Sequence, residues 1–317
     1  MLLDADARRW LADVTFSRVR YEEPMSRHTS FRVGGPAEAF VAPETSNELS
    51  ALVVGLADRE IPYHIVGGGT NLIVTDAGIS GVVICLKPCM SEIFIENISS
   101  SQSRVTVMAG TSLRLFCSHV IRKGLKGMNF ALGIPGTVGG AIRMNAGTAL
   151  GWISDVLESI TVMYPSGLQE MIGRNALSFS YRKLMLPQLS CGKTFSHQTI
   201  ILSGRFSLVR ASSTDLKHEA TEILKNRKCQ QPATLPSAGC IFKNPLVGKT
   251  AGELIDHCGL KGLKIGGAAV SVKHANFIVN DGSAVAADIL SLMDSVRNTV
   301  FERFNVNLEP EVIVIGN

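Results

Sequence analysis

Two glycine-rich stretches carry the residue types best suited to hold a phosphate-bearing ligand. The first is Val66-Gly-Gly-Gly-Thr-Asn-Leu72, and the second is Gly133-Ile-Pro-Gly-Thr-Val-Gly-Gly-Ala-Ile-Arg-Met-Asn-Ala-Gly147. Glycine has no Cβ, so backbone amides in such runs can approach a phosphate closely, and positive φ values cost little there. Thr137 and Asn145 add side-chain hydrogen-bonding groups. Together the stretches predict one extended cofactor held at two places, although either alone could be an ordinary turn.

Neither stretch fits the commonest nucleotide-binding motifs. Leu72 stands where a dinucleotide fingerprint starting at Gly67 needs its third glycine, and no acidic residue follows in the expected place. The Gly-Lys-Thr triplets at 192–194 and 248–250 have Pro187 and Lys243 where a P-loop needs its first glycine. Both common nucleotide folds are therefore disfavoured.

The elements that must position the first stretch form a small βαββ-like unit. An amphipathic pattern at residues 3–19 predicts a helix that precedes this unit. The unit itself is predicted as strand 38–42, a helix from Thr45 to about Arg59, strand 63–66 and strand 81–86. The first glycine stretch thus follows a strand end, where cofactors often bind.

Alternating and helical patterns continue around and after the second stretch. They predict a strand pair at 93–98 and 104–108, a helix at 112–122, antiparallel strands at 157–163 and 199–208, and a helix at 213–227. Further on they predict a helix at 250–258, strands at 266–272 and 275–280, a helix at 284–304, and a final strand at 308–315 that bears Glu309 and Glu311. The chain is therefore predicted to be α+β, with a compact module of its own in the last third.

Composition excludes several classes of protein. The chain is 45% hydrophobic and 18% charged, and no run approaches the length of a membrane span. Its first twenty residues have no signal-peptide pattern, so we expect a cytoplasmic protein. Seven cysteines form no Cys-x-x-Cys pair, which argues against a disulfide frame and against a metal site.

Charge is concentrated in one region. The net charge is +4, which indicates no nucleic-acid binder. Between residues 225 and 274, however, eight Lys and Arg stand against two acidic residues. This excess predicts either an anionic ligand or simply a solvated basic face.

Motifs over nearly the whole chain from His28 resemble one family. Besides both glycine stretches, they are Tyr181-Arg182, Pro236-Ser-Ala-Gly-Cys-Ile-Phe-Lys-Asn-Pro245 and Leu308-Glu-Pro-Glu-Val312. This set resembles the UDP-N-acetylenolpyruvoylglucosamine reductases, the MurB family. The resemblance implies a two-subdomain FAD-binding scaffold of the PCMH/VAO type followed by a C-terminal α+β substrate domain. The predicted ranges are 1–27 for the lead-in, 28–210 for the FAD-binding domain with subdomains near 28–88 and 89–210, and 211–317 for the UDP-sugar-binding domain.

The resemblance also implies an activity. Members bind FAD non-covalently and use NADPH to reduce UDP-N-acetylglucosamine enolpyruvate to UDP-N-acetylmuramate, a step of bacterial peptidoglycan synthesis. Hydride passes from flavin N5 to C3 of the enolpyruvyl group, and a proton is added at C2. We therefore expect that substrate and NADPH as partners, with no nucleic acid, membrane or obligate protein partner.

Site residues follow from matching the family's motifs position by position. Arg182, Cys240 and Glu311 match the catalytic positions, and Tyr181, Lys228, Asn244, Lys261 and His274 match positions that contact the substrate. The implied cofactor contacts are Val66, Gly67, Gly68, Gly69, Thr70, Asn71, Leu72, Ile134, Pro135, Gly136, Thr137, Gly139, Gly140, Asn145 and Ala146.

The implied chemistry needs a cation, an acid and an orienting group. The guanidinium of Arg182 can meet the negative charge that develops on the enolpyruvyl carboxylate. Most family members have serine at position 240, but an ordinary thiol, with a pKa of about 8.5, is mostly protonated at pH 7 and can donate the proton. A neighbouring Lys243 or Arg182 would oppose this by favouring the thiolate. Glu311 is expected to orient the proton path, and Ser237 is the alternative acid.

Other interpretations remain open. The stretch from Tyr181 to Cys240 contains no second tyrosine, which resembles the shorter subclass without a tyrosine-bearing lid. The same scaffold could serve a flavin-dependent oxidase of small alcohols or hydroxy acids, although neither glycine stretch carries the histidine or cysteine that often tethers such a flavin. A UDP-sugar sensor that lost catalysis is the third possibility.

Overall fold

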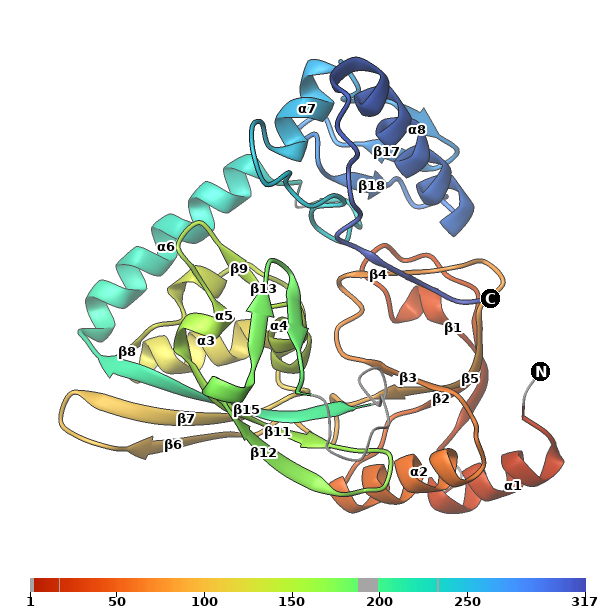
Figure 1. The fold of residues 1–317 in the computed structure, drawn as a ribbon, viewed down its shortest axis with the longest axis vertical. Coiled ribbons are helices and arrows are strands. Elements are labelled where there is room, and N and C mark those ends of the chain that lie inside the picture. Colours follow the sequence, from red (N-terminus) through yellow and green to blue (C-terminus); the bar gives the residue numbers. More distant parts are fainter. Residues whose placement is uncertain (1–2, 17, 188–198, 233) are drawn as a thin grey trace. The chain divides into compact units, whose positions relative to one another are not determined.

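A computed structural model describes residues 3–16, 18–187, 199–232 and 234–317 (Figure 1). They form two compact units. Unit 1 comprises Met1–Arg20, Ala39–Gly68 and Gly81–Lys225, and unit 2 comprises Tyr21–Glu38, Gly69–Ser80 and Asn226–Asn317. The division differs from the ranges predicted above, because short N-terminal segments belong with the C-terminal third of the chain. The first glycine stretch is itself divided between Gly68 and Gly69.

Most regular elements lie between residues 5 and 230. In chain order they are α1 (Ala5–Val14), β1 (Arg20–Pro24), η1 (Met25–Arg27), β2 (Pro36–Val41), α2 (Ser46–Asp58), β3 (Tyr63–Val66), β4 (Leu72–Val74), β5 (Ile79–Cys85), β6 (Ile93–Asn97), β7 (Gln102–Met108), α3 (Leu113–Arg122), β8 (Leu125–Lys126), η2 (Asn129–Ala131), α4 (Val138–Arg143), β9 (Gly147–Thr148), β10 (Gly151–Trp152), α5 (Ile153–Val156), β11 (Leu157–Met163), β12 (Gln169–Gly173), η3 (Arg174–Ala176), β13 (Ser178–Ser180), β14 (Lys183–Met185), β15 (Ile200–Arg210) and α6 (Ser213–Gln230).

The remaining elements belong to the last third of the chain. They are α7 (Ala251–His257), β16 (Lys264–Ile265), β17 (Ala268–Val270), β18 (Ile278–Asn280), α8 (Ala286–Phe304) and β19 (Ile313–Ile315). This mixture of helices and mainly antiparallel strands confirms the predicted α+β class. Among the described residues, none of the helices is both long enough and apolar enough to span a lipid bilayer.

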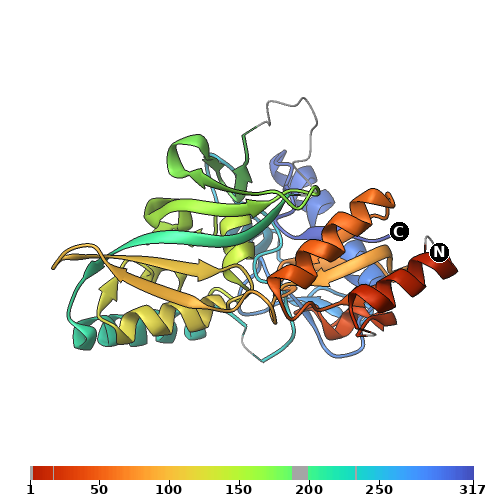
Figure 2. The ribbon, with the colours of Figure 1, turned by 90° about the horizontal axis from the view of Figure 1, so that it is seen from below.

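A six-stranded antiparallel sheet organises the larger part of unit 1. Its strand order is β12-β11-β15-β7-β6, and β8 also pairs with β15. The hairpin of β6 and β7 was predicted, as was the pairing of β11 with β15, and both are confirmed (Figure 2). The amphipathic helix α3 buries Phe116 against Phe206 of β15, with ring centroids 5.0 Å apart. Burial of each ring contributes about 2–3 kcal/mol.

The βαββ-like prediction is confirmed around β3 and β5. These strands are parallel, and a second sheet has the order β1-β2-β5-β3. Thr45 caps α2 by accepting a hydrogen bond from the amide of Glu48, as its sequence predicted. Helix α1 packs on α2 where Gly55 leaves space for the indole of Trp10. A side chain at Gly55 would collide with that ring.

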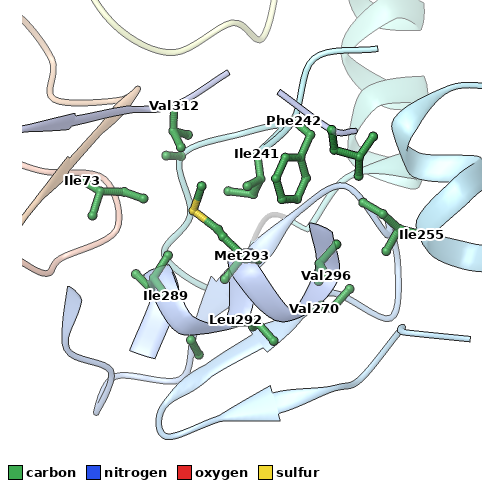
Figure 3. Packing of buried hydrophobic residues seen from close by; sticks show 14 of the residues in the cluster. Ile73, Ile241, Phe242, Ile255, Val270, Ile289, Leu292, Met293, Val296 and Val312 are labelled. Carbon is green, nitrogen blue, oxygen red and sulfur yellow. The ribbon is translucent and has the colours of Figure 1, made fainter. Parts of the chain in front are cut away.

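Unit 2 has its own hydrophobic core. Helix α8 packs on the β16-β17-β18 sheet, and its inner face presents Ile289, Leu292, Met293 and Val296 (Figure 3). Ile73 of β4 lies in the same cluster, because β4 pairs in parallel with β19 at the other end of the chain. Residues 69–80 are therefore an integral part of this unit.

A carboxylate strengthens that connection. Asp76 accepts hydrogen bonds from the amides of Ala286 and Ala287, at 2.8 and 2.9 Å, and so caps the first turn of α8. These amides have no partner inside the helix, and a negative charge there also complements the helix dipole. One prediction is wrong in this unit: Glu309 and Glu311 precede the final strand, which is only Ile313–Ile315.

Candidate functional site

The two glycine stretches meet in unit 1. A side chain at Gly67 would collide with the hydroxyl of Thr137, so the first stretch can lie against the second only with glycine there. Thr137 is buried and caps α4, accepting from the amide of Gly140 at 3.5 Å. Within the second stretch, Val138–Arg143 is helical.

Gly139 and Gly140 differ in what an added side chain would meet. The amide of Gly139 donates to the carbonyl of Ala109 at 2.9 Å, and a Cβ at Gly139 would approach that of Ala109 to 2.8 Å. Gly139 is thus a packing glycine. At Gly140 the nearest atom to an added Cβ is the hydroxyl of Thr137, at 3.7 Å, and the residue is exposed. Its open face suits a ligand that lies directly on the backbone, as the predicted dinucleotide would.

Arg182 occupies a two-residue hairpin turn close to the second stretch. Strands β13 and β14 pair through Ser180 and Lys183, which leaves Tyr181 and Arg182 as the turn. Arg182 has φ of 59°, a left-handed conformation that costs an L-residue about 1–2 kcal/mol. Its Nη1 donates to the carbonyl of Gly147 at 3.1 Å.

Asn145 holds this hairpin in place. Its Nδ2 donates to the carbonyl of Ser180 at 3.2 Å, and its Oδ1 accepts from the amide of Ser154 at 3.2 Å. The side chain predicted to contact the cofactor is therefore engaged with protein backbone. It connects the second glycine stretch to the residue that precedes Tyr181.

Asn71 has the corresponding part in unit 2. Its Nδ2 donates to the carbonyl of Glu311 at 3.0 Å, and its carbonyl accepts from the amide of Ile313 at 2.9 Å. Gly69 keeps φ of 61° there, and a side chain at this glycine would collide with the carbonyl of His28. The second half of the first stretch thus fixes the backbone of Glu311.

Cys240 and Glu311 lie on neighbouring segments of unit 2. Cys240 forms an antiparallel bridge with Phe277, and the amide of Glu311 donates to the carbonyl of Ile241 at 2.7 Å. An added Cβ at Gly239, which has φ of 82°, would have open space around it. The half-buried thiol is therefore next to backbone that leaves room for a ligand.

Lys243 is less able to favour a thiolate than its sequence position suggested. Its Nζ lies 3.2 Å from the Glu309 carboxylate, which offsets the cationic charge. Six cysteines are free thiols among the described residues, and Cys191 lies outside them. No group of three or more His, Cys, Asp or Glu in the described part of the chain could hold a metal ion.

Three predicted substrate contacts surround α7. Asn244 accepts from the amide of Ala251 at 3.1 Å, and Lys261 pairs with Asp256. Nδ1 of His274 accepts from the amide of Asn276 at 3.2 Å. Burial lowers the pKa of His274 below its usual value near 6.5, and the charge of Lys261 lowers it further. His274 is consequently a neutral hydrogen-bonding group at pH 7.

The remaining predicted residues are distributed between both units. Lys228 on α6 is exposed and belongs to unit 2. Its backbone carbonyl accepts a hydrogen bond from Nζ of Lys273 at 2.6 Å. Arg182 and Tyr181 are in unit 1, whereas Cys240 and Glu311 are in unit 2. The other predicted cofactor contacts lie in the two glycine stretches: Val66, Gly68, Thr70, Leu72, Ile134, Pro135, Gly136 and Ala146.

Sequence reasoning missed one contact of Arg182. The guanidinium carbon lies 5.3 Å from the ring centroid of Trp152, in addition to 5.2 Å from that of Tyr181. A tryptophan directly after Gly151 gives no motif by itself. Only the pairing of β9 with β10 brings it to the hairpin.

Comparisons with known proteins agree with this arrangement. Residues 37–172 match the family described as FAD binding domain, and residues 231–315 match the C-terminal domain of UDP-N-acetylenolpyruvoylglucosamine reductase. The UDP-N-acetylenolpyruvoylglucosamine reductase of Desulfosudis oleivorans is 45% identical over 99% of this chain and 100% of its own length. That of Syntrophobacter fumaroxidans is 41% identical over 96% of this chain and 85% of its own.

A solved structure gives the same result. The crystal structure of MurB from Thermus caldophilus covers 94% of this chain and 98% of its own, with a TM-score of 0.77 and 36% identity. Fold and glycine stretches together define an FAD-binding oxidoreductase of mixed α and β structure. The chain belongs to the UDP-N-acetylenolpyruvoylglucosamine reductase (MurB) family.

Proposed function

We propose that this chain uses NADPH to reduce UDP-N-acetylglucosamine enolpyruvate to UDP-N-acetylmuramate for peptidoglycan synthesis in the cytoplasm. Family membership over the full chain supports the reaction class. The structural observation that carries the proposal is the 2.7 Å hydrogen bond between the amide of Glu311 and the carbonyl of Ile241. It brings together the segments that hold the proposed proton donor and its orienting carboxylate.

The glycine stretches would hold the FAD. The open face of Gly140 and the close contact of Gly67 with Thr137 support a pyrophosphate lying on backbone at this point. When bound, the flavin supplies hydride transfer from NADPH to C3 of the enolpyruvyl group. Asn145 and Asn71 contribute by shaping the backbone, since their amide groups are bonded to Ser180 and Glu311.

Arg182 would stabilise the substrate carboxylate. Reduction at C3 places negative charge on C2 and on that carboxylate, and a planar guanidinium can meet both oxygens with two N–H groups. The left-handed backbone at Arg182 is an unfavourable conformation maintained by surrounding contacts, which is typical of residues with a functional constraint. Loss of such a donor commonly costs about 3–4 kcal/mol of transition-state stabilisation.

Cys240 would deliver the proton to C2, and Glu311 would orient it. The pairing of Lys243 with Glu309 leaves less uncompensated positive charge on the segment of Cys240. A positioned acid commonly contributes about 10²–10⁴-fold in rate. His274, Asn244, Lys261 and Lys228 would contact the UDP-sugar. Lys228 would supply the positive charge there, because His274 is neutral and Lys261 is paired with Asp256.

Half-reaction kinetics test the proposal. Flavin reduction is followed with NADPH alone, and flavin reoxidation is then followed after addition of UDP-N-acetylglucosamine enolpyruvate. Cys240→Ser should keep most of the reoxidation rate. Cys240→Ala should slow reoxidation by about 10²–10⁴-fold and leave reduction unchanged. Cys229→Ala, at an exposed cysteine of α6, is the matched control and should alter neither step.

The variants also discriminate between donors. Normal reoxidation in Cys240→Ala together with a slow Ser237→Ala would transfer the role to Ser237. An enzyme that consumes no NADPH in a substrate-dependent manner would contradict the reductase proposal and leave a binding function. Flavin colour that remains on acid-precipitated protein would instead favour a covalent oxidase.

A further inference from the structure

The guanidinium of Arg182 is enclosed by two aromatic rings and a carbonyl. Its central carbon lies 5.3 Å from the centroid of Trp152 and 5.2 Å from that of Tyr181. The two rings contact each other edge to face, with centroids 5.7 Å apart and an interplanar angle of 77°. The distances from the guanidinium carbon to the two ring centroids, 5.3 and 5.2 Å, are within the range of a cation–π interaction, about 6 Å. Nη1 also donates a hydrogen bond to the carbonyl of Gly147.

The backbone around Trp152 is built to accommodate its indole. Trp152 pairs with Gly147 across β9 and β10, and a Cβ at position 147 would collide with the indole ring. Gly151 precedes it with φ of 142°, which favours glycine. The amide of Trp152 donates to Asp155 at 2.8 Å, which fixes the entry to α5. Two glycines and one carboxylate thus place this ring beside Arg182.

Tyr181 by itself is less able to fix the arginine. It shares the turn with Arg182, so its contact with the guanidinium lies within the hairpin itself. Trp152 is on a separate element, 30 residues earlier, whose backbone is paired with the end of the second glycine stretch. The indole and the hydrogen bond from Nη1 to Gly147 therefore both position the guanidinium relative to the second glycine stretch.

We propose that Trp152 is a positioning residue for the reaction: it holds the Arg182 guanidinium in the orientation that receives the substrate carboxylate. The proposal rests on the proposed role of Arg182. A guanidinium that lies against an aromatic face can still turn the N–H groups at its edge toward a ligand, and it is only weakly hydrated. Trp152 thereby lowers the reorganisation needed when the carboxylate charge increases in the transition state.

The test measures both half-reactions of the FAD-loaded enzyme. Trp152→Leu removes the aromatic face and should lower the limiting rate of flavin reoxidation by substrate about tenfold, the loss expected from one partly desolvated cation–π contact. The substrate concentration for half-maximal rate should change much less. Trp152→Phe keeps an aromatic face and should restore most of the rate. Flavin reduction by NADPH should be the same in all variants.

A matched control and a double variant separate positioning from simple destabilisation. Trp10→Phe changes the other tryptophan of the chain, which packs between α1 and α2, and should leave both half-reactions unchanged. In an Arg182→Ala background, Trp152→Leu should have no further effect on reoxidation. An equal tenfold loss in that background would show that Trp152 acts without Arg182 and would overturn the proposal.

Fluorescence tests the contact independently of turnover. In the FAD-loaded Trp10→Phe protein, Trp152 is the single indole, and Arg182→Ala should increase its quenching by acrylamide. Unchanged quenching would contradict the stacking itself. If Arg182→Ala increases quenching but reoxidises at the normal rate, the contact exists and the proposed catalytic role of Arg182 fails instead.

Discussion

Arg182 and Glu311 are held by backbones of opposite kinds. Arg182 is in a hairpin turn of unit 1 with a left-handed φ of 59°. Glu311 is in a segment of unit 2 that is held by the isolated bridge between Phe242 and Pro310 and by the hydrogen bond from its own amide to Ile241. In both cases an asparagine from a glycine stretch donates to a nearby carbonyl, Asn145 to Ser180 and Asn71 to Glu311.

The difference concerns how each side chain gains its direction. Glu311 has no left-handed φ, so backbone hydrogen bonds to the neighbouring segment can direct its carboxylate without such strain. A left-handed turn is unfavourable for arginine, so the surrounding contacts must maintain it. We infer that the glycine stretches serve in part as anchors for the proposed catalytic segments, and that the anchor in unit 1 carries the larger energetic load.

Asn145 provides the largest expected effect. Asn145→Gly preserves a residue suited to its φ of 40° but leaves the carbonyl of Ser180 and the amide of Ser154 without these partners. Two lost hydrogen bonds of a buried side chain should lower the free energy of unfolding by about 2–4 kcal/mol, measured by denaturant unfolding of the FAD-loaded protein. Asn145→Asp keeps the acceptor for Ser154 but turns a carboxylate oxygen toward the carbonyl of Ser180, so it should lose at least as much. A loss below about 1 kcal/mol in the glycine variant would contradict the anchoring role.

Asn71 should give a smaller effect. Its half-buried side chain makes one hydrogen bond, to Glu311, and the pairing of β4 with β19 continues beside it. Asn71→Ala should therefore lower the free energy of unfolding by about 1 kcal/mol. The same denaturant experiment compares the two anchors directly. A loss in Asn71→Ala as large as that in Asn145→Gly would remove the distinction between them.

Local patterns predicted the elements that form from neighbouring residues. Strand β3 was predicted at its observed bounds, and the helix predicted at 250–258 is observed as α7, because both depend on patterns within a few residues. Strand β4 was not predicted, since its three residues form a strand only by pairing with residues 313–315. Glu311 was wrongly predicted to lie on the final strand. Its amide bonds to the carbonyl of Ile241, which is distant in sequence, so local patterns could not show how Glu311 is held.

The site shows the same limit. Motifs identified Arg182, Cys240 and Glu311, and those roles remain predictions, but no pattern indicated Trp152 beside the guanidinium. The side chains of Asn71 and Asn145 were predicted to contact the cofactor, and sequence could not reveal that backbone carbonyls already engage them. Side-chain partners across elements require the fold.

At the two proposed catalytic positions, the glycine and alanine variants should rank in opposite orders of stability. At position 182 the left-handed φ makes Arg182→Gly more stable than Arg182→Ala by about 1 kcal/mol, although both lose the aromatic contacts. At position 311 the extended backbone makes Glu311→Gly less stable than Glu311→Ala by about 0.5–1 kcal/mol. Thermal unfolding of the four variants measures both differences. The same ranking at both positions would show that strain does not distinguish the two backbones.

His274 should give the smallest effect, confined to unit 2 and to acidic pH. Burial lowers its pKa in the folded protein, so between its usual pKa near 6.5 and the lower folded value the unfolded chain binds more protons. Stability should therefore fall as pH decreases below about 6.5, and His274→Gln should remove this part of the loss. Burial also lowers the pKa of His64 in unit 1, so His64→Gln provides the comparison. If unfolding free energies at pH 7.5 and 5.5 differ by the same amount in His274→Gln as in the unmodified chain, then His274 does not titrate as a buried neutral group.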